Sequence, residues 1–365
     1  MLSPSWGHRA WRASAIAVVA GAALAIAACG SDEKTEGTPA QSAKKPTGAP
    51  VKIMVVSAVD TPIQDYPDVW AAGKAAANAI NDAGGINGQP IEILTCNDKS
   101  DPNGATACAR EAVSKKVAVV TGTSIGTAAM LPVLESAGLQ WVGGFAQQQI
   151  DCTAANAWPL TLGSRVFPAV PIALAKQGKK KVGGAVTGVA AAEQNIEQWQ
   201  RGADAVGVQL SQPVVKMPIE ATDFAPFVQQ LKNQKIDSAT AGASSTQIIQ
   251  LMKTAEQLGL KVLWGQQAGS VNSKLLQDLG SAGEGLLVIG PLPAIDADVP
   301  VSKRFNSEMD AAEKAGVSDT ENRRTPTENT WLALHAIAAL GQRIDGTIDA
   351  ASITKTLQSE KDIDV

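Results

Sequence analysis

From residue 51 onward, apolar and polar residues switch repeatedly between the pattern of a strand and the pattern of a helix. Residues 51–59 (VKIMVVSAV) are a β-branched apolar run of strand length. Residues 68–83 then carry apolar side chains at helical spacing, and two glycines follow as a helix stop. The same alternation predicts strands at 91–95, 117–121 and 139–142 and helices at 102–115 and 127–137. This order predicts a parallel sheet with helices on both faces.

A second block of the same kind begins after Pro168. It predicts strands at 181–186, 210–216, 236–241 and 261–264, and helices at 193–206, 224–233 and 246–258. Two such blocks indicate two α/β lobes, one over residues 51–165 and one over residues 166–292. A mostly helical tail follows, with 327–340 its clearest amphipathic piece. One economical arrangement returns residues 293–345 to the first lobe.

The first thirty residues have the pattern of a targeting segment. Arg9 and Arg12 precede an apolar stretch, 14–28, that is shorter than the roughly 20 residues a membrane-spanning helix needs. This pattern predicts a signal peptide over residues 1–28. The stretch ends in small residues directly before Cys29 and resembles the lipobox of bacterial lipoproteins, in which that cysteine is lipidated. The alternative is an ordinary signal peptide with an incidental cysteine.

Residues 29–50 are rich in Gly, Ser, Thr, Pro and Lys and show no apolar periodicity. Such a composition cannot bury a hydrophobic face, so we expect a flexible tether between a lipid and a folded body. A lipid-anchored body of this kind is extracytoplasmic, bound to the cell membrane, and exposed to oxidising conditions.

Composition narrows the function. The chain of 365 residues has a formal net charge of −4 and only two histidines, of which His8 lies in the predicted signal peptide. The one remaining histidine, His335, argues against histidine-based metal centres and catalytic pairs. The acidic balance argues against nucleic acid as a partner. The sequence contains neither a phosphate-binding G-x-x-x-x-G-K-[ST] loop nor an H-E-x-x-H helix. We therefore expect no enzyme, no metal and no cofactor.

Three segments carry a family resemblance. Residues 70–93 (WAAGKAAANAINDAGGINGQPIEI), 119–124 (VVTGTS) and 131–138 (LPVLESAG) are similar to type I periplasmic binding proteins, most of all to the branched-chain amino-acid (Leu/Ile/Val) branch of ABC transporter solute-binding proteins. The resemblance implies two Rossmann-like lobes with parallel sheets, joined by hinge strands, that close on a small solute. It also implies ABC permease subunits as partners, which receive the solute.

The resemblance bears on the cysteines and on the end of the chain as well. Relatives often carry a disulfide in the first lobe, which implies a Cys96–Cys108 bridge. Cys152 is then left over, either as a thiol or as a competitor for one of the other two. Residues 346–365 are assigned to a C-terminal hinge or second-lobe segment. Relatives continue past a comparable helix, so we expect the chain to be cut short.

Ligands of open α/β sheets bind beyond the carboxyl ends of the strands. Thr123 and Ser124 follow one predicted strand, where the family places a Ser or Thr on the ligand carboxylate; the alternative is simple helix capping. Ala146 and Gln147 follow the next strand, where the family supplies a backbone carbonyl and a hydroxyl to the ligand amine. The hydroxyl is missing here, so Gln147 is either a ligand contact or a solvent-facing loop residue.

The second lobe departs from the amino-acid-binding pattern. Val189, Ala190 and Ser244 occupy loops in which amino-acid-binding relatives carry tyrosines. Gln267 lies near the position of a glutamate that holds the ligand ammonium. A neutral amide cannot provide that charge-assisted bond. The Leu/Ile/Val specificity of the relatives therefore does not carry over directly. A neutral or anionic polar solute, or another small acid or amide, is as compatible with these loops as a branched-chain amino acid.

Two functions fit this reading. The first is a lipid-anchored solute-binding protein that feeds an ABC importer with a small, amino-acid-like or related solute. The second is a ligand-sensing receptor of the same fold that signals to a membrane partner. The sequence itself does not separate them.

Overall fold

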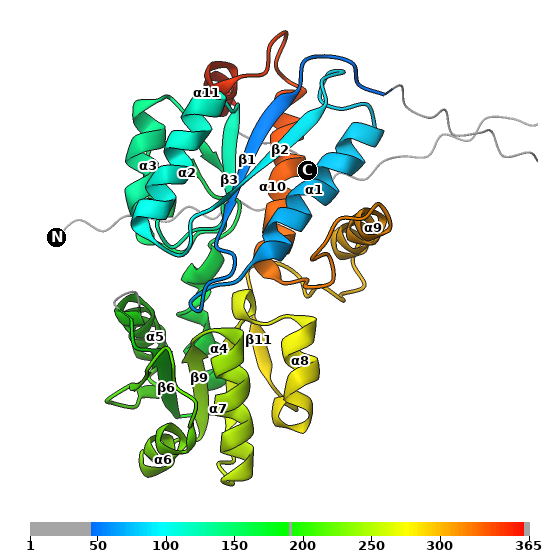
Figure 1. Cartoon of the computed structure of the whole chain (residues 1–365). Coiled ribbons are helices and arrows are strands. Elements are labelled where there is room, and N and C mark those ends of the chain that lie inside the picture. Colours follow the sequence, from blue (N-terminus) through cyan, green and yellow to red (C-terminus); the bar gives the residue numbers. More distant parts are fainter. Residues whose placement is uncertain (1–44, 190–191, 361–365) are drawn as a thin grey trace, which may run out of the picture. The chain divides into compact units, whose positions relative to one another are not determined.

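The computed structural model describes residues 45–189 and 192–360, which belong to one compact unit (Figure 1). The predicted signal peptide, the lipidation residue Cys29 and most of the predicted tether lie outside the described residues, as does Ala190. Two parallel sheets with helices on their faces organise the described chain, so the predicted two-lobed α/β fold is confirmed.

The first lobe is built on a five-stranded sheet of order β2-β1-β3-β4-β5. Its strands are β1 (Val51–Ser57), β2 (Ile91–Asn97), β3 (Val119–Gly122), β4 (Trp141–Val142) and β5 (Ala157–Trp158). Its helices α1 (Pro67–Asp82), α2 (Pro102–Lys115) and α3 (Thr127–Ser136) lie close to the predicted ranges. Alternate β1 side chains point to opposite faces. Val55 packs in the core with α1, and Met54 packs in the core with α2 and α3.

The second lobe is built on the strand path β11-β10-β9-β6-β7, with β8 also paired to β6. The strands are β6 (Lys181–Thr187), β7 (Gln209–Leu210), β8 (Val215–Met217), β9 (Ser238–Gly242), β10 (Leu263–Gln267) and β11 (Leu287–Ile289). The helices are α4 (Ala169–Lys176), α5 (Ala192–Val206), α6 (Ala225–Asn233), α7 (Ser245–Gln257) and α8 (Ser273–Leu279). The predicted strand 210–216 is divided into β7 and β8, because Pro213 between them has no N–H to donate to a neighbouring strand.

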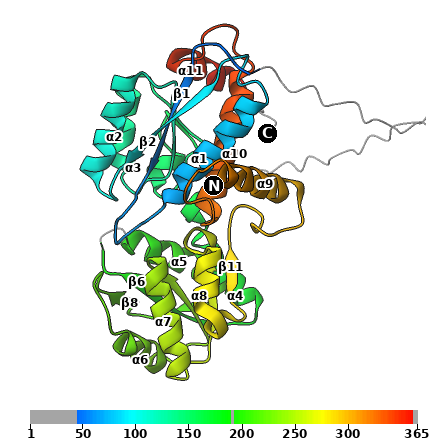
Figure 2. The same cartoon turned by 45° about the vertical axis from the view of Figure 1, so that its right-hand side comes forward.

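The helical tail after β11 packs on the first lobe. It contains α9 (Pro300–Lys314) and α10 (Thr325–Gly341), whose residues Phe305, Leu334 and Ile337 share a core with Val55 of β1. Both views of the chain show α10 beside α1, although the two helices are far apart in sequence (Figures 1 and 2). The tail thus completes one face of the first sheet.

The assignment of residues 346–365 needs a correction. Helix α11 (Ala350–Ser359) lies on the first lobe and is not part of a hinge or of the second lobe. Ile353 and Leu357 are four residues apart, so they share one helix face, and that face is buried in the core that also holds Val51. Thr354 is attached to the same lobe, since its hydroxyl donates to the Gly138 carbonyl. Residues 361–365 lie outside the described residues.

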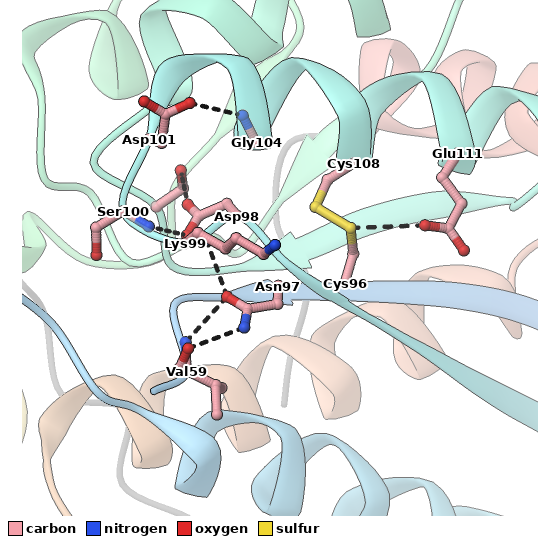
Figure 3. Close-up of a disulfide and its surroundings, with 11 residues drawn as sticks. Val59, Cys96, Asn97, Asp98, Lys99, Ser100, Asp101, Gly104, Cys108 and Glu111 are labelled. Carbon is pink, nitrogen blue, oxygen red and sulfur yellow. Dashed lines mark hydrogen bonds between the residues drawn. A yellow bond between two sulfur atoms is a disulfide. The ribbon is translucent and has the colours of Figure 1, made fainter. Parts of the chain in front are cut away.

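A disulfide ties α2 to the sheet. Cys96 of β2 is bonded to Cys108 of α2, which confirms the pairing that the family resemblance implied (Figure 3). The turn before α2 is fixed by Asp101, whose carboxylate accepts hydrogen bonds from the amides of Asn103 and Gly104 (2.8 and 3.1 Å). Cys152, in a short 3-10 helix after β4, takes no part in that bond.

Candidate functional site

A pocket of about 130 Å³ is lined by residues that follow the carboxyl ends of strands in both sheets. The first lobe contributes Ile63, Gln64, Tyr66, Ile125, Phe145, Gln147 and Gln148. Phe167 and the second lobe contribute Thr187, Val189, Ala192, Gln194, Asn195, Ala241, Gly242, Ala243, Ser244, Gln267, Gly269 and Ser270. The strand-end loops that the sequence singles out therefore meet at one place.

The first-lobe wall is a chain of side-chain amides. Gln147 Nε2 donates to the Thr123 hydroxyl at 2.6 Å, and Gln64 Nε2 donates to Gln147 Oε1 at 2.7 Å. The Gln147 backbone amide is held in turn by the Asp151 carboxylate at 2.7 Å. Two predicted site residues, Thr123 and Gln147, are thus in direct contact. Gln147 reaches the pocket surface, whereas Thr123 is fully buried behind it.

The hydroxyl of Ser124, in the turn between β3 and α3, has different partners from that of Thr123. The Ser124 side chain donates to the Asp98 carboxylate, and its oxygen accepts the Gly126 amide at 2.9 Å. Ser124 and Asp98 are both fully buried. Burial raises the pKa of the Asp98 carboxyl, and the Ser124 hydrogen bond opposes that shift. Ser124 therefore stabilises the turn from behind the pocket.

Residues 122–126 (GTSIG) also match the G-x-S-x-G pattern of a serine nucleophile elbow. The geometry does not support that chemistry, because the Ser124 hydroxyl is bound to a carboxylate and not to an imidazole. The imidazole of His335 has its ring nitrogens against Glu308 Oε2 and Arg304 Nη2, at 2.8 and 2.9 Å. Among residues 45–189 and 192–360, no cluster of three or more His, Cys, Asp or Glu side chains could hold a metal ion.

Gly122 sets the position of this turn. Its φ is +113°, and a Cβ at this position would lie 2.1 Å from the Val56 carbonyl oxygen, so only glycine fits. The close approach lets the Thr123 amide bond that same carbonyl at 2.9 Å. The hydroxyl of Thr123 is thereby held against Gln147.

Three polar side chains of the second-lobe wall are held in place by hydrogen bonds to the starts of helices. Ser244 is the N-cap of α7, and its oxygen accepts the Gln247 amide at 3.4 Å. Thr187 donates its hydroxyl proton to Gln247 Oε1 at 2.6 Å. Gln267 caps a short 3-10 helix, with Oε1 accepting the Gly269 amide at 2.7 Å. These caps fix the side chains that face the pocket.

A buried ion pair holds the segment between β1 and α1 in place. Asp68 and Arg324 form hydrogen bonds of 2.6 and 2.9 Å, and the Arg324 guanidinium lies 4.4 Å from the centre of the Tyr66 ring. Tyr66 lines the pocket, and burial raises the pKa of its hydroxyl. Burial also raises the pKa of the Asp68 carboxyl, against the opposing effect of Arg324.

The predicted site residues divide into three groups. Gln147, Val189, Ser244 and Gln267 line the pocket; Thr123, Ser124 and Ala146 are buried outside the lining; Ala190 lies outside the described residues. The lining also includes Thr187 and Ser270, which lie in strand-end loops where ligand contacts are predicted, and three polar residues that were not predicted, namely Gln64, Gln194 and Asn195. Their position just after strands or at helix starts is the one sequence signal that points to them.

A family model described as periplasmic binding protein matches residues 50–365. The chain belongs to this family of periplasmic binding proteins. Membership implies a solute-binding function and an extracytoplasmic location. The Leu/Ile/Val-binding protein of Escherichia coli (strain K12) is 24% identical over 318 residues, which cover 85% of this chain and 83% of that relative.

Solved structures share the fold of this periplasmic binding protein. One is a branched-chain amino acid transporter substrate-binding protein from Streptococcus pneumoniae in complex with isoleucine, with a TM-score of 0.72, 18% identity, and coverage of 86% of this chain and 89% of that chain. Another is an ABC transporter solute-binding protein from R. palustris in complex with 4-hydroxybenzoate, with a TM-score of 0.71, 19% identity and 84% coverage of both chains. Within the described part of the periplasmic binding protein, no helix has the length and hydropathy to cross a membrane.

Proposed function

We propose that this protein captures a small polar solute in the pocket between its two sheets and delivers it to the permease of an ABC importer. The observation that carries the proposal is the origin of the lining, since strand-end residues from both lobes contribute to it. A solute seated there touches both lobes at once. Binding can therefore favour a closed arrangement that a permease recognises.

The relatives support the transport role and leave the solute open. The curated relative is a Leu/Ile/Val-binding protein, whereas one structural relative holds isoleucine and another holds 4-hydroxybenzoate. The same fold therefore serves solutes of different chemistry. The residues of this pocket, and not the family, must be used to choose among them.

The test is a thermal-shift screen of the full chain, purified in detergent, against amino acids, amides, sugars and organic acids. A ligand at 100 times its Kd stabilises the folded state by about 2.7 kcal/mol, so a true solute raises the melting temperature by several degrees. The variant Ser244→Val, which removes a lining hydroxyl, should reduce the shift. If no small solute raises the melting temperature of the wild-type protein, the proposed function is wrong.

Transport is tested in cells. Deletion of the gene should abolish uptake of the solute found in the screen, and the wild-type gene should restore it. If the wild-type gene restored a cellular response to the solute but no uptake of it, the protein would be a receptor, and delivery to an importer would be contradicted.

We also infer that Cys29 carries a lipid that holds the protein at the cell membrane. The support is the sequence pattern of residues 1–29, a short apolar stretch that ends in small residues before the cysteine. Cys29→Ser should release the protein from the membrane fraction and remove the mass of the lipid from the purified chain. Retention of Cys29→Ser in the membrane fraction would contradict the anchor.

A further inference from the structure

The pocket is polar but carries no ionic side chain among the residues that the structure describes. Its polar groups are amides and hydroxyls, and its apolar surface comes from Ile63, Ile125, Phe145, Phe167 and Val189. A charged group buried without a partner of opposite charge is strongly disfavoured. An ammonium group of a solute would therefore meet no carboxylate on the described walls.

The orientation of the Gln267 side-chain amide decides whether the second-lobe wall presents a hydrogen-bond donor or an acceptor to the pocket. The Gly269 backbone N–H donates to Gln267 Oε1 at 2.7 Å. An amide nitrogen cannot accept that bond, so the side chain of Gln267 has only one possible orientation. Its Nε2 is left as the outer end of the amide. Gln267 is 7% exposed and lines the pocket.

Gln267 consequently presents hydrogen-bond donors to the pocket. Within the described part of the chain, Gln267 Nε2 donates no hydrogen bond to another residue. Because Gln267 lines the pocket, an oxygen acceptor of a solute can take these donors in place of water. An ammonium group has only donors and cannot do so.

Ser244 and the start of α7 provide further hydrogen-bond donors beside Gln267. The Ser244 oxygen already accepts the Gln247 amide at 3.4 Å, which leaves its hydroxyl proton to be donated. Ser244 also begins α7, a helix of 13 residues whose first N–H groups and dipole favour an electron-rich atom. Gln267 Nε2 and the N-terminus of α7 thus give this wall donors for an oxygen of the solute, and the Ser244 hydroxyl can add one more.

We propose that the solute presents an oxygen acceptor, the carbonyl or carboxylate oxygen of a small organic acid or amide, to Gln267 and carries no ammonium group. This inference rests on the proposed function, because it assigns a class of solute to the same pocket. Gln267 is then the residue that determines specificity against α-amino acids. Carboxylates and carboxamides share the required oxygen, and the experiment separates them.

The test compares probes of one carbon skeleton by isothermal titration calorimetry on the full chain in detergent. L-leucine carries an ammonium, 4-methyl-2-oxopentanoate carries oxygens only, and 4-methylpentanamide is a neutral amide. A second set pairs 4-hydroxybenzoate with 4-hydroxybenzamide and with 4-(aminomethyl)benzoate. The wild-type protein should bind the best ammonium-free probe of a set at least tenfold more tightly than the ammonium-bearing one.

The decisive variant is Gln267→Glu. One carboxylate oxygen can still accept the Gly269 N–H, so the cap is preserved, while the other replaces the donor with an acceptor. The preference against the ammonium probe should fall at least tenfold or reverse. Carboxylate probes should lose more affinity than carboxamides, because two carboxylates repel each other. The control Gln257→Glu adds the same charge at an exposed position of α7 and should leave every affinity unchanged.

The outcomes separate this inference from the proposed function. Preference of the wild-type protein for L-leucine or 4-(aminomethyl)benzoate would overturn the inference and leave the proposed function standing. An unchanged preference in a folded Gln267→Glu protein would also overturn it, because Gln267 would then be a cap alone. Failure of both proteins to bind any probe, while the thermal-shift screen finds a solute of another class, would overturn the inference alone. Failure in that screen as well contradicts the proposed function.

Discussion

Arg324 holds Asp68 through two hydrogen bonds across 256 positions of the chain, with distances of 2.6 and 2.9 Å. Asp68 is 0% exposed and Arg324 is 5% exposed. Arg324 Nη2 also donates to the Asp65 carbonyl at 3.3 Å, and its guanidinium stacks on Tyr66. One side chain therefore joins the returning tail to α1 and fixes the loop that carries Gln64 and Tyr66 into the pocket.

Breaking this pair should unfold the protein more easily. Asp68→Asn or Arg324→Met leaves one buried group without its ionic partner, which typically costs about 3–5 kcal/mol. Urea denaturation should show that loss for each single variant and a combined loss smaller than the sum. The control Lys274→Ala removes an exposed pair with Asp278, which should contribute less than about 1 kcal/mol. Wild-type stability in Asp68→Asn would contradict this account.

The spacing of apolar residues was sufficient to predict helices and strands that bury one face or that are buried on all sides. The run at β1 and the spacing in α1 give their bounds to within a few residues, because each follows from the face that the element buries. The tail was harder to place. Residues 346–365 look equally suited to either lobe in sequence, and only the contact of Ile353 and Leu357 with the first-lobe core assigns α11.

The site was predictable as a set of loops but not as a set of contacts. Strand ends identify the turn after β3, yet the sequence cannot show that Asp98, 26 positions earlier, takes the Ser124 hydroxyl. Nor can it show that Gln64 pairs with Gln147 across 83 positions. Such pairings depend on how the strands are ordered in the sheet, and local pattern does not contain that order.

Thr123 and Ser124 should have different effects when changed. Ser124→Ala leaves the buried Asp98 carboxylate without one donor, and such a loss costs about 1–3 kcal/mol of unfolding free energy. Its solute affinity should stay within about twofold of wild type. Thr123→Val removes the acceptor for Gln147 Nε2 and loosens the pocket wall, so affinity should fall about tenfold, or 1.4 kcal/mol. Calorimetry measures the solute affinity and urea denaturation the stability of both variants. A loss of affinity in Ser124→Ala, with affinity unchanged in Thr123→Val, would mean that Ser124 contacts the ligand.

The Cys96–Cys108 bond should stabilise the first lobe. It closes a short loop, with a sequence separation of 12, and a loop of about 15 residues corresponds to about 3 kcal/mol in the chain-entropy model. Dithiothreitol should lower the urea midpoint of the wild-type protein. It should have no further effect on the double variant Cys96→Ala/Cys108→Ala, which controls for other actions of the reductant. Equal midpoints with and without reductant in the wild type would show that the bond contributes nothing.

Glu328, in the first turn of α10, gives a pH dependence of stability. It is 1% exposed, and neither carboxylate oxygen has a hydrogen-bond partner within the described residues. Burial raises the pKa of Glu328 to about 7 from the ordinary value of 4.5. The folded state therefore favours the protonated carboxyl, and the unfolded state releases that proton at lower pH.

The sign of the effect follows from this difference. Stabilisation by the neutral carboxyl is fully present below pH 4.5 and is lost as pH rises through about 7, a change on the order of 3 kcal/mol. Glu328→Gln cannot ionise, so its unfolding free energy relative to wild type should increase between pH 5 and pH 8 and then level off. Urea denaturation at half-unit steps of pH measures that difference. The control Glu313→Gln, at an exposed position of α9, should give a flat difference over the same range. A flat difference for Glu328→Gln as well would mean that this carboxylate finds a partner or water when it ionises.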